Sequence, residues 1–289
     1  MTLPTKQPTV AQALGEARAA GVERLEAQRL LAQVLAQPRS WLIAHDDAVL
    51  NAAQATSFNA GLARLSSGEP LAYVLGEHEF HGLLLHVDSQ VLVPRADTEV
   101  LVDWALEVVR PGPASAEVLD LGTGSGAIAL ALAHTVPAAR VCAVDASPTA
   151  LAVARANGHR LGLPVEWLLS DWWAGLAARR FDLIVSNPPY IAGDDAHLAA
   201  LRHEPRMALT PGGDGLDALR HIAAGATAHL QPGGWLLLEH GYDQAEAVST
   251  MLRAHGLHDV QTRHDLAGQP RCTGARLAGA RVGPRPHIP

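Results

Sequence analysis

The segment Asn187-Pro188-Pro189-Tyr190 combines residue types that suit the binding of a planar amine. It follows an apolar run at 181–186 that predicts a buried strand. Two consecutive prolines can continue neither a strand ladder nor a helix, and Pro188 also favours an extended backbone at Asn187. The sequence therefore predicts a stiff corner at a strand end, which presents an amide side chain, backbone carbonyls and an aromatic ring. Such a corner could hold a planar –NH2 group.

A glycine-rich turn lies between a predicted strand at 117–121 and a predicted helix at 127–133. The residues of this turn are Gly122-Thr123-Gly124-Ser125-Gly126. Glycines let the backbone come close to a ligand, and the first N–H groups of the helix can bind one. The G-x-G-x-G spacing is one residue short of the G-x-G-x-x-G of dinucleotide binders. The turn therefore indicates a nucleotide-like ligand and disfavours a dehydrogenase.

An acidic residue, Asp145, ends a further predicted strand at 140–145. In a doubly wound sheet, a carboxylate at this position can accept both hydrogen bonds of a ribose diol. Capping of the next helix is the alternative role, but Ser147 could serve it equally well. Because the glycine turn precedes it, we favour the ribose role for Asp145.

Two tryptophans and an acid follow the predicted strand at 165–169, in the order Asp171-Trp172-Trp173. An indole at a strand end could stack on an adenine, and a carboxylate beside it could accept from the exocyclic amine. A pair of tryptophans is also compatible with simple core packing. Only the position at the end of a strand favours the adenine role.

Strands and helices alternate from residue 117 onward. Beyond the elements already named, the sequence predicts a strand at 235–239 and helices at 149–156 and 214–230. This alternation predicts an α/β fold with a doubly wound, mainly parallel, Rossmann-like sheet. The carboxyl ends of its strands share one crevice. We therefore expect the glycine turn, the ribose acid, the tryptophan and the Asn-Pro-Pro-Tyr corner to meet there.

The remaining segments define the domain organisation. Residues 1–70 carry apolar side chains at helical spacing, which predicts a small all-helical domain. Residues 71–93 alternate loosely and contain glycines, which predicts a β-hairpin linker. The sheet domain then occupies 94–279. The last segment, 280–289, is rich in Pro, Gly and Arg and predicts a disordered tail.

Composition narrows the class of protein. The 289-residue chain is 48% hydrophobic and 18% charged, which is typical of a globular protein, and its formal charge of −7 argues against general affinity for nucleic acid. No apolar run has the length of a membrane helix, and the first residues have no apolar core of signal-peptide length. The two cysteines give neither a disulfide framework nor a metal set, and the 15 histidines are scattered. We expect a cytoplasmic monomer without a metal site.

Several segments resemble class I S-adenosylmethionine-dependent methyltransferases, and more narrowly the protein-(glutamine-N5) methyltransferases that act on peptide chain release factors. The matching segments are Gly68 to Tyr73, Gly76 to Phe80, Pro94 to Glu99, Asp120 to Ala131, Ser170 to Trp172, Ser186 to Ile191, Glu204-Pro205 and Leu236 to Gly241. Ala96 departs from the family pattern, which usually has a second proline at that position. The helical domain suits the family's docking domain for release factors.

The resemblance implies a cofactor and the residues that bind it. The cofactor would be S-adenosyl-L-methionine, with S-adenosyl-L-homocysteine as the product. The turn from Gly122 to Gly126 would wrap the methionine part, Asp145 would bind the ribose and Trp172 would contact the adenine region. Asn187 would lie where the cofactor and the substrate meet.

The resemblance also implies a substrate, the glutamine of the Gly-Gly-Gln motif of release factors, whose methylation supports translation termination. Asn187 would orient its side-chain amide, and Pro188, Pro189 and Tyr190 would complete the pocket. An amide nitrogen is a poor nucleophile because its lone pair is delocalised. If the Asn187 oxygen and the Pro188 carbonyl each accept one N–H, they hold this nitrogen in line with the methyl group and stabilise its developing positive charge. Tyr190 would pack against the amide plane, and no acid is assigned as a general base.

Other functions use some of the same features. Adenine N6 and cytosine N4 are also planar amines, so a DNA methyltransferase fits the corner, although it ordinarily needs a basic face to admit a flipped base. A methyltransferase for a ribosomal-protein glutamine fits more closely. A noncatalytic Rossmann-like binding module is disfavoured because the corner and the glycine turn occur together.

Overall fold

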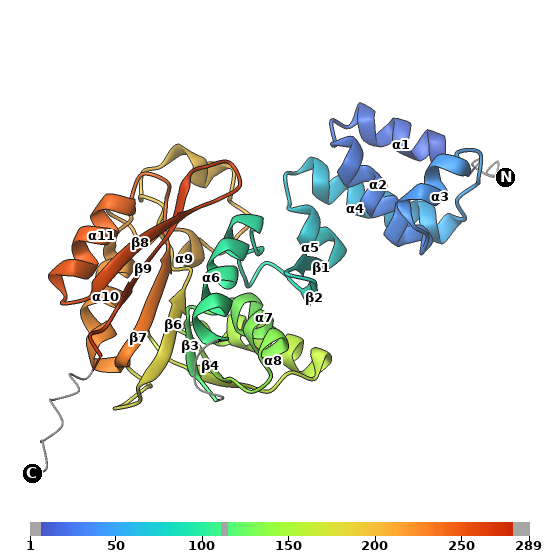
Figure 1. Cartoon of the computed structure of the whole chain (residues 1–289). Helices are drawn as coiled ribbons and strands as arrows, with labels where there is room; N and C mark the ends of the chain where they lie inside the picture. Colours follow the sequence, from blue (N-terminus) through green and yellow to red (C-terminus); the bar gives the residue numbers. More distant parts are fainter. Residues whose placement is uncertain (1–6, 111–114, 280–289) are drawn as a thin grey trace, which may run out of the picture. The chain divides into compact units, whose positions relative to one another are not determined.

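The computed structural model describes residues 7–110 and 115–279. It divides the chain into two compact units, with the boundary in the sequence between Glu77 and His78. Figure 1 shows a helical unit in blue and a sheet unit in green to red. The predicted tail at 280–289 lies outside the described residues. Among the described helices, none combines the length and the apolar character needed to cross a bilayer.

The first unit is helical, as the sequence predicts. Its helices are α1 (Val10–Ala19), α2 (Arg24–Leu35), α3 (Arg39–Ala44), α4 (Ala52–Ser66) and α5 (Leu71–Leu75). Thr9 begins α1 and Asn51 begins α4, and each forms a capping box in which the side chain accepts from the third helical N–H. Leu31, Leu50 and Phe58 are buried in the core that the helices share.

The predicted hairpin linker is wrong over its first residues, because Leu71–Leu75 form helix α5. Pro70 precedes this helix and Gly76, with φ of +75°, ends it. Tyr73 is buried, and the side chain of Arg64 donates to its carbonyl at 3.0 Å. Packing against α2 and α4 therefore decides the local structure of a segment whose loose alternation suggested a strand.

The predicted hairpin is present after Gly76, as β1 (Glu77–Phe80) and β2 (Leu83–His86). His81 and Gly82 connect the strands, and both have positive φ values, of +48° and +77°. Such a pair of left-handed residues matches the twist of a tight two-residue hairpin turn. Glu79 supports the turn by accepting a hydrogen bond from the Gly82 N–H at 2.8 Å.

The second unit is built on a seven-stranded sheet with the order β5-β4-β3-β6-β7-β9-β8. Its strands are β3 (Glu117–Leu121), β4 (Arg140–Asp145), β5 (Val165–Leu169), β6 (Phe181–Ser186), β7 (Leu230–Glu239), β8 (His258–His264) and β9 (Pro270–Arg276). The pairs from β5 to β7 are parallel, and β9 and β8 continue the sheet antiparallel. The predicted doubly wound, mainly parallel sheet is confirmed.

Helices cover both faces of this sheet. They are α6 (Glu99–Val109), α7 (Ala127–Thr135), α8 (Pro148–Leu161), α9 (Arg206–Leu209), α10 (Asp217–His229) and α11 (Ala245–Ala254), with short 3-10 helices η1 (Ala96–Thr98) and η2 (Ala196–Ala199). Helices α6 and α7 supply one buried cluster, and α10 and α11 supply the other. The sequences of β3, β4 and β6 are nearly continuous apolar runs, as expected for strands that are covered on both faces.

The carboxyl-terminal part of the sheet departs from the sequence expectation. Strand β7 begins at Leu230, before the predicted start at 235, and Gly233 within it has φ of +84°. Strands β8 and β9 and helix α11 are not predicted. The residues of β9 carry no alternating apolar pattern, so it is their pairing with β7 on one side and β8 on the other that makes them a strand.

Substitution of Gly274, in β9, should show how tightly this sheet packs. An added Cβ would collide with Leu237 and lie 2.6 Å from Cη2 of Trp104, so we expect Gly274→Ala to destabilise the unit by about 1–3 kcal/mol. Urea unfolding followed by tryptophan fluorescence measures this change. At Gly279 an added Cβ meets no atom within 4 Å, so Gly279→Ala is the matched control. Equal midpoints for the two variants would contradict the packing.

Candidate active site

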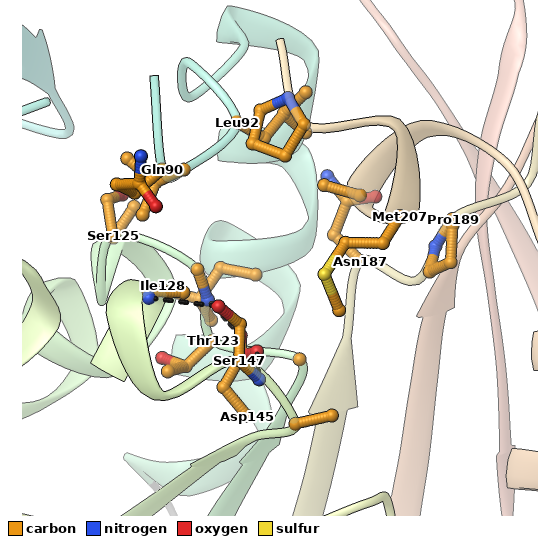
Figure 2. A pocket seen from close by; sticks show the side chains of 18 of the residues that line it. Gln90, Leu92, Thr123, Ser125, Ile128, Asp145, Ser147, Asn187, Pro189 and Met207 are labelled. Atoms are coloured by element: carbon orange, nitrogen blue, oxygen red, sulfur yellow. Dashed lines mark hydrogen bonds between the residues drawn. The ribbon is translucent and has the colours of Figure 1, made fainter. Parts of the chain in front are cut away.

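A pocket opens at the carboxyl ends of the parallel strands, and most of the predicted site residues line it. Figure 2 shows Asn187 and Met207 on one side of this pocket, with Thr123 and Asp145 across from them. The predicted residues in its wall are Gly122, Thr123, Gly124, Ser125, Asp145, Trp172, Asn187 and Pro189. Gly126, Pro188 and Tyr190 do not line it. The carboxyl ends of the parallel strands therefore bring together the glycine turn, the Asp145 carboxylate, the Trp172 indole and the Asn187 amide.

The glycine turn needs its glycines for two different reasons. Gly122, Gly124 and Gly126 have φ values of +73°, +57° and +84°, which side chains rarely adopt. A Cβ at Gly122 would approach the Trp172 ring at 3.6 Å, inside the pocket wall. A Cβ at Gly126 would instead lie 3.0 Å from the ring of Trp167, so this glycine lets α7 pack closely on the sheet.

Beneath the turn lies Asp120, a buried acid that the sequence did not single out by itself. The Thr123 hydroxyl donates to its Oδ2 at 2.6 Å, which holds the middle of the turn down against β3. Burial raises the pKa of Asp120 to about 7. The Thr123 side chain therefore supports the turn through its bond to Asp120.

Asp145 holds the turn from the side. Its Oδ2 accepts from the Gly124 N–H at 2.9 Å and its Oδ1 accepts from the Ser147 N–H at 2.8 Å. Burial raises the pKa of Asp145, while these backbone donors oppose the shift. The Ser147 side chain accepts from the Ala150 N–H and so caps α8. Since Ser147 serves as the cap, the carboxylate of Asp145 is left to face the pocket.

The two neighbouring tryptophans have different surroundings. Trp172 lines the pocket and has a left-handed backbone, with φ of +48°. Trp173 stacks on His229 at 4.8 Å between ring centroids, and its indole N–H donates to the His221 carbonyl. Both tryptophans are half-buried and pack against the same cluster, but only Trp172 lines the pocket, whereas Trp173 is engaged by His221 and His229.

The Asn187 amide is oriented by a residue from a distant segment. Its Nδ2 donates to the hydroxyl of Thr98 at 3.1 Å. Thr98 ends η1, is buried, and lines the same pocket. With Nδ2 bound to Thr98, the Oδ1 atom remains as the acceptor that Asn187 can offer to a ligand.

Tyr190 is held behind the pocket. Its hydroxyl donates to Oε1 of Glu239, the last residue of β7, at 3.3 Å. Burial and the neighbouring carboxylate raise the pKa of Tyr190. The Tyr190 carbonyl also accepts from the Gln244 side chain at 3.0 Å. Its predicted contact with a substrate amide stays a prediction.

Glu204 joins the two segments that form the rim of the pocket, 90–94 and 205–208. Its carboxylate is buried, accepts from the Val93 N–H at 3.1 Å and pairs with Arg95. More than a hundred residues separate these partners, so no spacing in the sequence reveals the pair. The result is a rim whose two sides are tied together, with Met207 exposed at its edge (Figure 2).

Asn157, in α8, ties the glycine turn to the hairpin. It is fully buried, and its Nδ2 donates to the Ser125 carbonyl at 3.0 Å and to the His86 carbonyl at 2.9 Å. Its Oδ1 accepts from the His86 N–H at 2.7 Å. A single side chain therefore connects β2 with the wall of the pocket.

Within residues 7–110 and 115–279, no three His, Cys, Asp or Glu side chains gather as a metal would require.

Comparison with known proteins identifies the family. The family model of the methyltransferase small domain matches residues 97–255, and that of the PrmC N-terminal domain matches residues 9–76. The release factor glutamine methyltransferase of Bordetella pertussis is 51% identical over 260 residues, covering 89% of this chain and 96% of the relative. The chain belongs to the release factor glutamine methyltransferase family.

Other relatives place the whole chain in the same family. The release factor glutamine methyltransferase of Burkholderia pseudomallei is 49% identical over 284 residues, covering 95% of this chain and 99% of the relative. A solved methyltransferase from Pyrococcus furiosus matches with a TM-score of 0.53 and 20% identity, covering 68% of this chain and 90% of that chain, which shows the shared fold. The protein is therefore a methyltransferase, as the sequence predicts.

Proposed function

We propose that this methyltransferase transfers a methyl group from S-adenosylmethionine to the side-chain nitrogen (N5) of the glutamine in the Gly-Gly-Gln motif of peptide chain release factors. The observation that carries the proposal is the Asn187 amide, which lies in one pocket with the glycine turn and Asp145 in a chain of this family. The product would be S-adenosylhomocysteine, and the reaction would support translation termination in the cytoplasm.

The pocket residues suit S-adenosylmethionine. Each Asp145 oxygen accepts one backbone N–H, and a carboxylate oxygen has a second lone pair, so a ribose diol can still be bound. Gly122 and Gly124 have positive φ values, which favour glycine. Because glycine has no side chain, the backbone of the turn is open to a ligand in the pocket. Trp172 offers an indole beside the turn. When bound, the cofactor supplies a methyl group on a positively charged sulfur, which is the electrophile of the reaction.

The role of the protein in catalysis is to position the amide nitrogen and to stabilise its charge. Asn187 Oδ1 and the Pro188 carbonyl would each accept one N–H of the glutamine side chain. Two acceptors in fixed positions align the nitrogen lone pair and favour the positive charge that develops on it. A strong base is not required before the transfer, because the proton can leave afterwards. Pro189, and Tyr190 from behind it, would complete the substrate pocket.

The helical unit would dock the release factor, since its sequence matches the PrmC N-terminal domain and its helices lie outside the sheet unit that holds the pocket. The formal charge of −7 disfavours DNA as the substrate. A ribosomal-protein glutamine remains the nearest alternative, because it presents the same amide. We expect the chain to act as a monomer.

Mass spectrometry after incubation with S-adenosylmethionine tests the substrate. A purified release factor should gain the mass of one added methyl group on the glutamine of its Gly-Gly-Gln motif. Duplex DNA and purified ribosomal proteins, incubated in parallel, should stay unmodified. An unmodified release factor beside methylated DNA or a methylated ribosomal protein would overturn the proposal.

A further inference from the structure

One apolar side chain at the rim of the pocket is exposed and has no role in the functions described so far. Met207 belongs to α9, lines the pocket and is 58% exposed. The other large apolar residues of the pocket wall are buried or half-buried, and they are Val91, Leu92, Ile128 and Trp172. A ligand that covers Met207 would remove its apolar surface from water, which favours binding.

The backbone around Met207 is fixed on both sides. Before it, the Glu204 carboxylate accepts from the Val93 N–H at 3.1 Å. After it, the carbonyl of the buried Leu209 accepts from the Ile191 N–H at 3.0 Å, and Ile191 directly follows the Asn-Pro-Pro-Tyr corner. These bonds hold α9 against both the opposite rim segment and the corner. The Met207 side chain has three rotatable bonds of its own, so it can still adapt to a ligand.

The position of Met207 favours the substrate over the cofactor as its partner. Figure 2 shows Met207 on the same side of the pocket as Asn187, whereas Asp145 lies across from them. The proposed function gives the Asp145 side to the cofactor and the Asn187 side to the substrate amide. Pro205 and Ala208, the neighbours of Met207 in the wall, are apolar as well. A substrate bound at Asn187 therefore meets an apolar surface on α9.

A glutamine side chain has a polar end and an apolar stem. Its amide group would bind the Asn187 oxygen, so its two methylene groups would extend from there back toward the rim. Burial of one methylene group strengthens binding by about fourfold. A methionine side chain suits this task, because its flexible thioether fills irregular apolar gaps.

On the basis of the proposed function, we propose that Met207 is a substrate-binding residue that closes over the methylene groups of the target glutamine. The side chain is exposed in the free enzyme and becomes buried when the glutamine enters the pocket. This contact strengthens the binding of the substrate. It takes no part in the transfer of the methyl group, which depends on the acceptors at the corner.

Oxidation of methionine tests the contact in the wild-type protein, because the oxidant must reach the sulfur. Dilute hydrogen peroxide is added to the free enzyme, to the enzyme with S-adenosylhomocysteine, and to the enzyme with S-adenosylhomocysteine and unmethylated release factor. The ternary complex persists, since S-adenosylhomocysteine has no methyl group to transfer. Mass spectrometry of tryptic peptides then gives the rate at which Met207 gains an oxygen.

Release factor should slow the oxidation of Met207 by about fivefold, as its exposed fraction falls from 58% to that of a buried side chain. S-adenosylhomocysteine alone should leave the rate near that of the free enzyme. Met251 is the internal control, because it packs on the core from α11 and does not line the pocket. Trypsin cleaves after Arg220 and so separates the two methionines. The oxidation rate of Met251 should be the same in all three samples.

Steady-state kinetics of two variants give a second readout. In Met207→Ala the KM for release factor should rise about 4- to 16-fold, the cost of uncovering one or two methylene groups, while kcat stays within about twofold. Met207→Leu restores an apolar side chain of similar volume and should lie within about threefold of wild type. Affinity for S-adenosylhomocysteine should be unchanged in both. Leu169→Ala is the matched control, since Leu169 is 59% exposed at the end of β5 but outside the pocket wall, and it should keep the wild-type KM.

The outcomes separate this role from the proposed function. Protection of Met207 by S-adenosylhomocysteine alone would assign the side chain to the cofactor and overturn the proposal. An enzyme that methylates release factor but leaves Met207 equally oxidised in its presence, or that keeps its KM in Met207→Ala, would also overturn it. If a variant does not fold, the oxidation rates of the wild-type protein decide. If the wild-type enzyme leaves release factor unmodified, the proposed function is wrong and the role of Met207 falls with it.

Discussion

Asn187→Ala should lower kcat for release factor methylation by about 10²–10³-fold, the cost of removing one fixed polar partner from a developing charge. The substitution removes the Oδ1 acceptor and leaves the Pro188 carbonyl alone to hold the substrate amide. It also leaves the Thr98 hydroxyl without its partner. Single-turnover mass spectrometry of the release factor measures the loss directly. Affinity for S-adenosylhomocysteine should fall less than kcat, because the glycine turn and Asp145 are untouched.

Asn187→Asp separates the two functions of this side chain. The aspartate keeps an acceptor oxygen toward the substrate but loses the NH2 group that binds Thr98. We therefore expect activity between that of the wild-type enzyme and that of Asn187→Ala. If Asn187→Ala retained kcat within about tenfold of wild type, the loss would be smaller than one such interaction is worth, and the assigned role would be wrong.

Asp145→Ala should weaken the binding of S-adenosylhomocysteine by roughly 10- to 150-fold for each ribose hydrogen bond lost, because a hydrogen bond to a charged group contributes about 1.5–3 kcal/mol. The carboxylate is expected to accept from the ribose, and it also fixes the Gly124 and Ser147 N–H groups. The variant therefore loses a ligand contact and the anchor of the turn at once. Asp145→Asn should be nearly as weak, since its NH2 group would oppose one of the two backbone donors.

Asp182→Asn is the control for this substitution. Asp182 lies near the start of β6, at the opposite end of the sheet from the pocket, and its Oδ2 also accepts a backbone N–H, from Glu117 at 2.9 Å. Titration calorimetry should give wild-type affinity for Asp182→Asn. Wild-type affinity in Asp145→Ala would contradict the assignment of Asp145 to the cofactor.

The positions that were predictable from the sequence are those governed by local rules. Asn187, Asp145 and the glycine turn each follow a buried apolar run, and the ends of parallel strands must share an edge of the sheet. The division of labour between Trp172 and Trp173 was not predictable, because it depends on a left-handed backbone at Trp172 that its sequence does not require.

The roles of residues that depend on tertiary contacts were not predictable from the sequence. Thr98 reaches Asn187 and Glu239 reaches Tyr190 only after the sheet has formed, and no spacing links them. The turn was predicted to contact a ligand throughout, whereas Gly126 serves the packing of α7 against Trp167. Helix α11 is the exception: Val248, Met251 and Leu252 have helical spacing, and this signal could have been used.

The Asn157 side chain couples the hairpin to the glycine turn. It bonds both polar groups of the His86 backbone and the Ser125 carbonyl, so opening of strand β2 or of the turn breaks hydrogen bonds to the same side chain. Any ligand that orders the turn must then slow hydrogen exchange at the His86 amide. Linkage is reciprocal, so a partner that steadies β2 should raise the affinity of the turn for its ligand by the same factor by which the ligand raises the affinity for that partner. Hydrogen exchange at the His86 amide should therefore report the binding of a ligand at the glycine turn, to which Asn157 connects it.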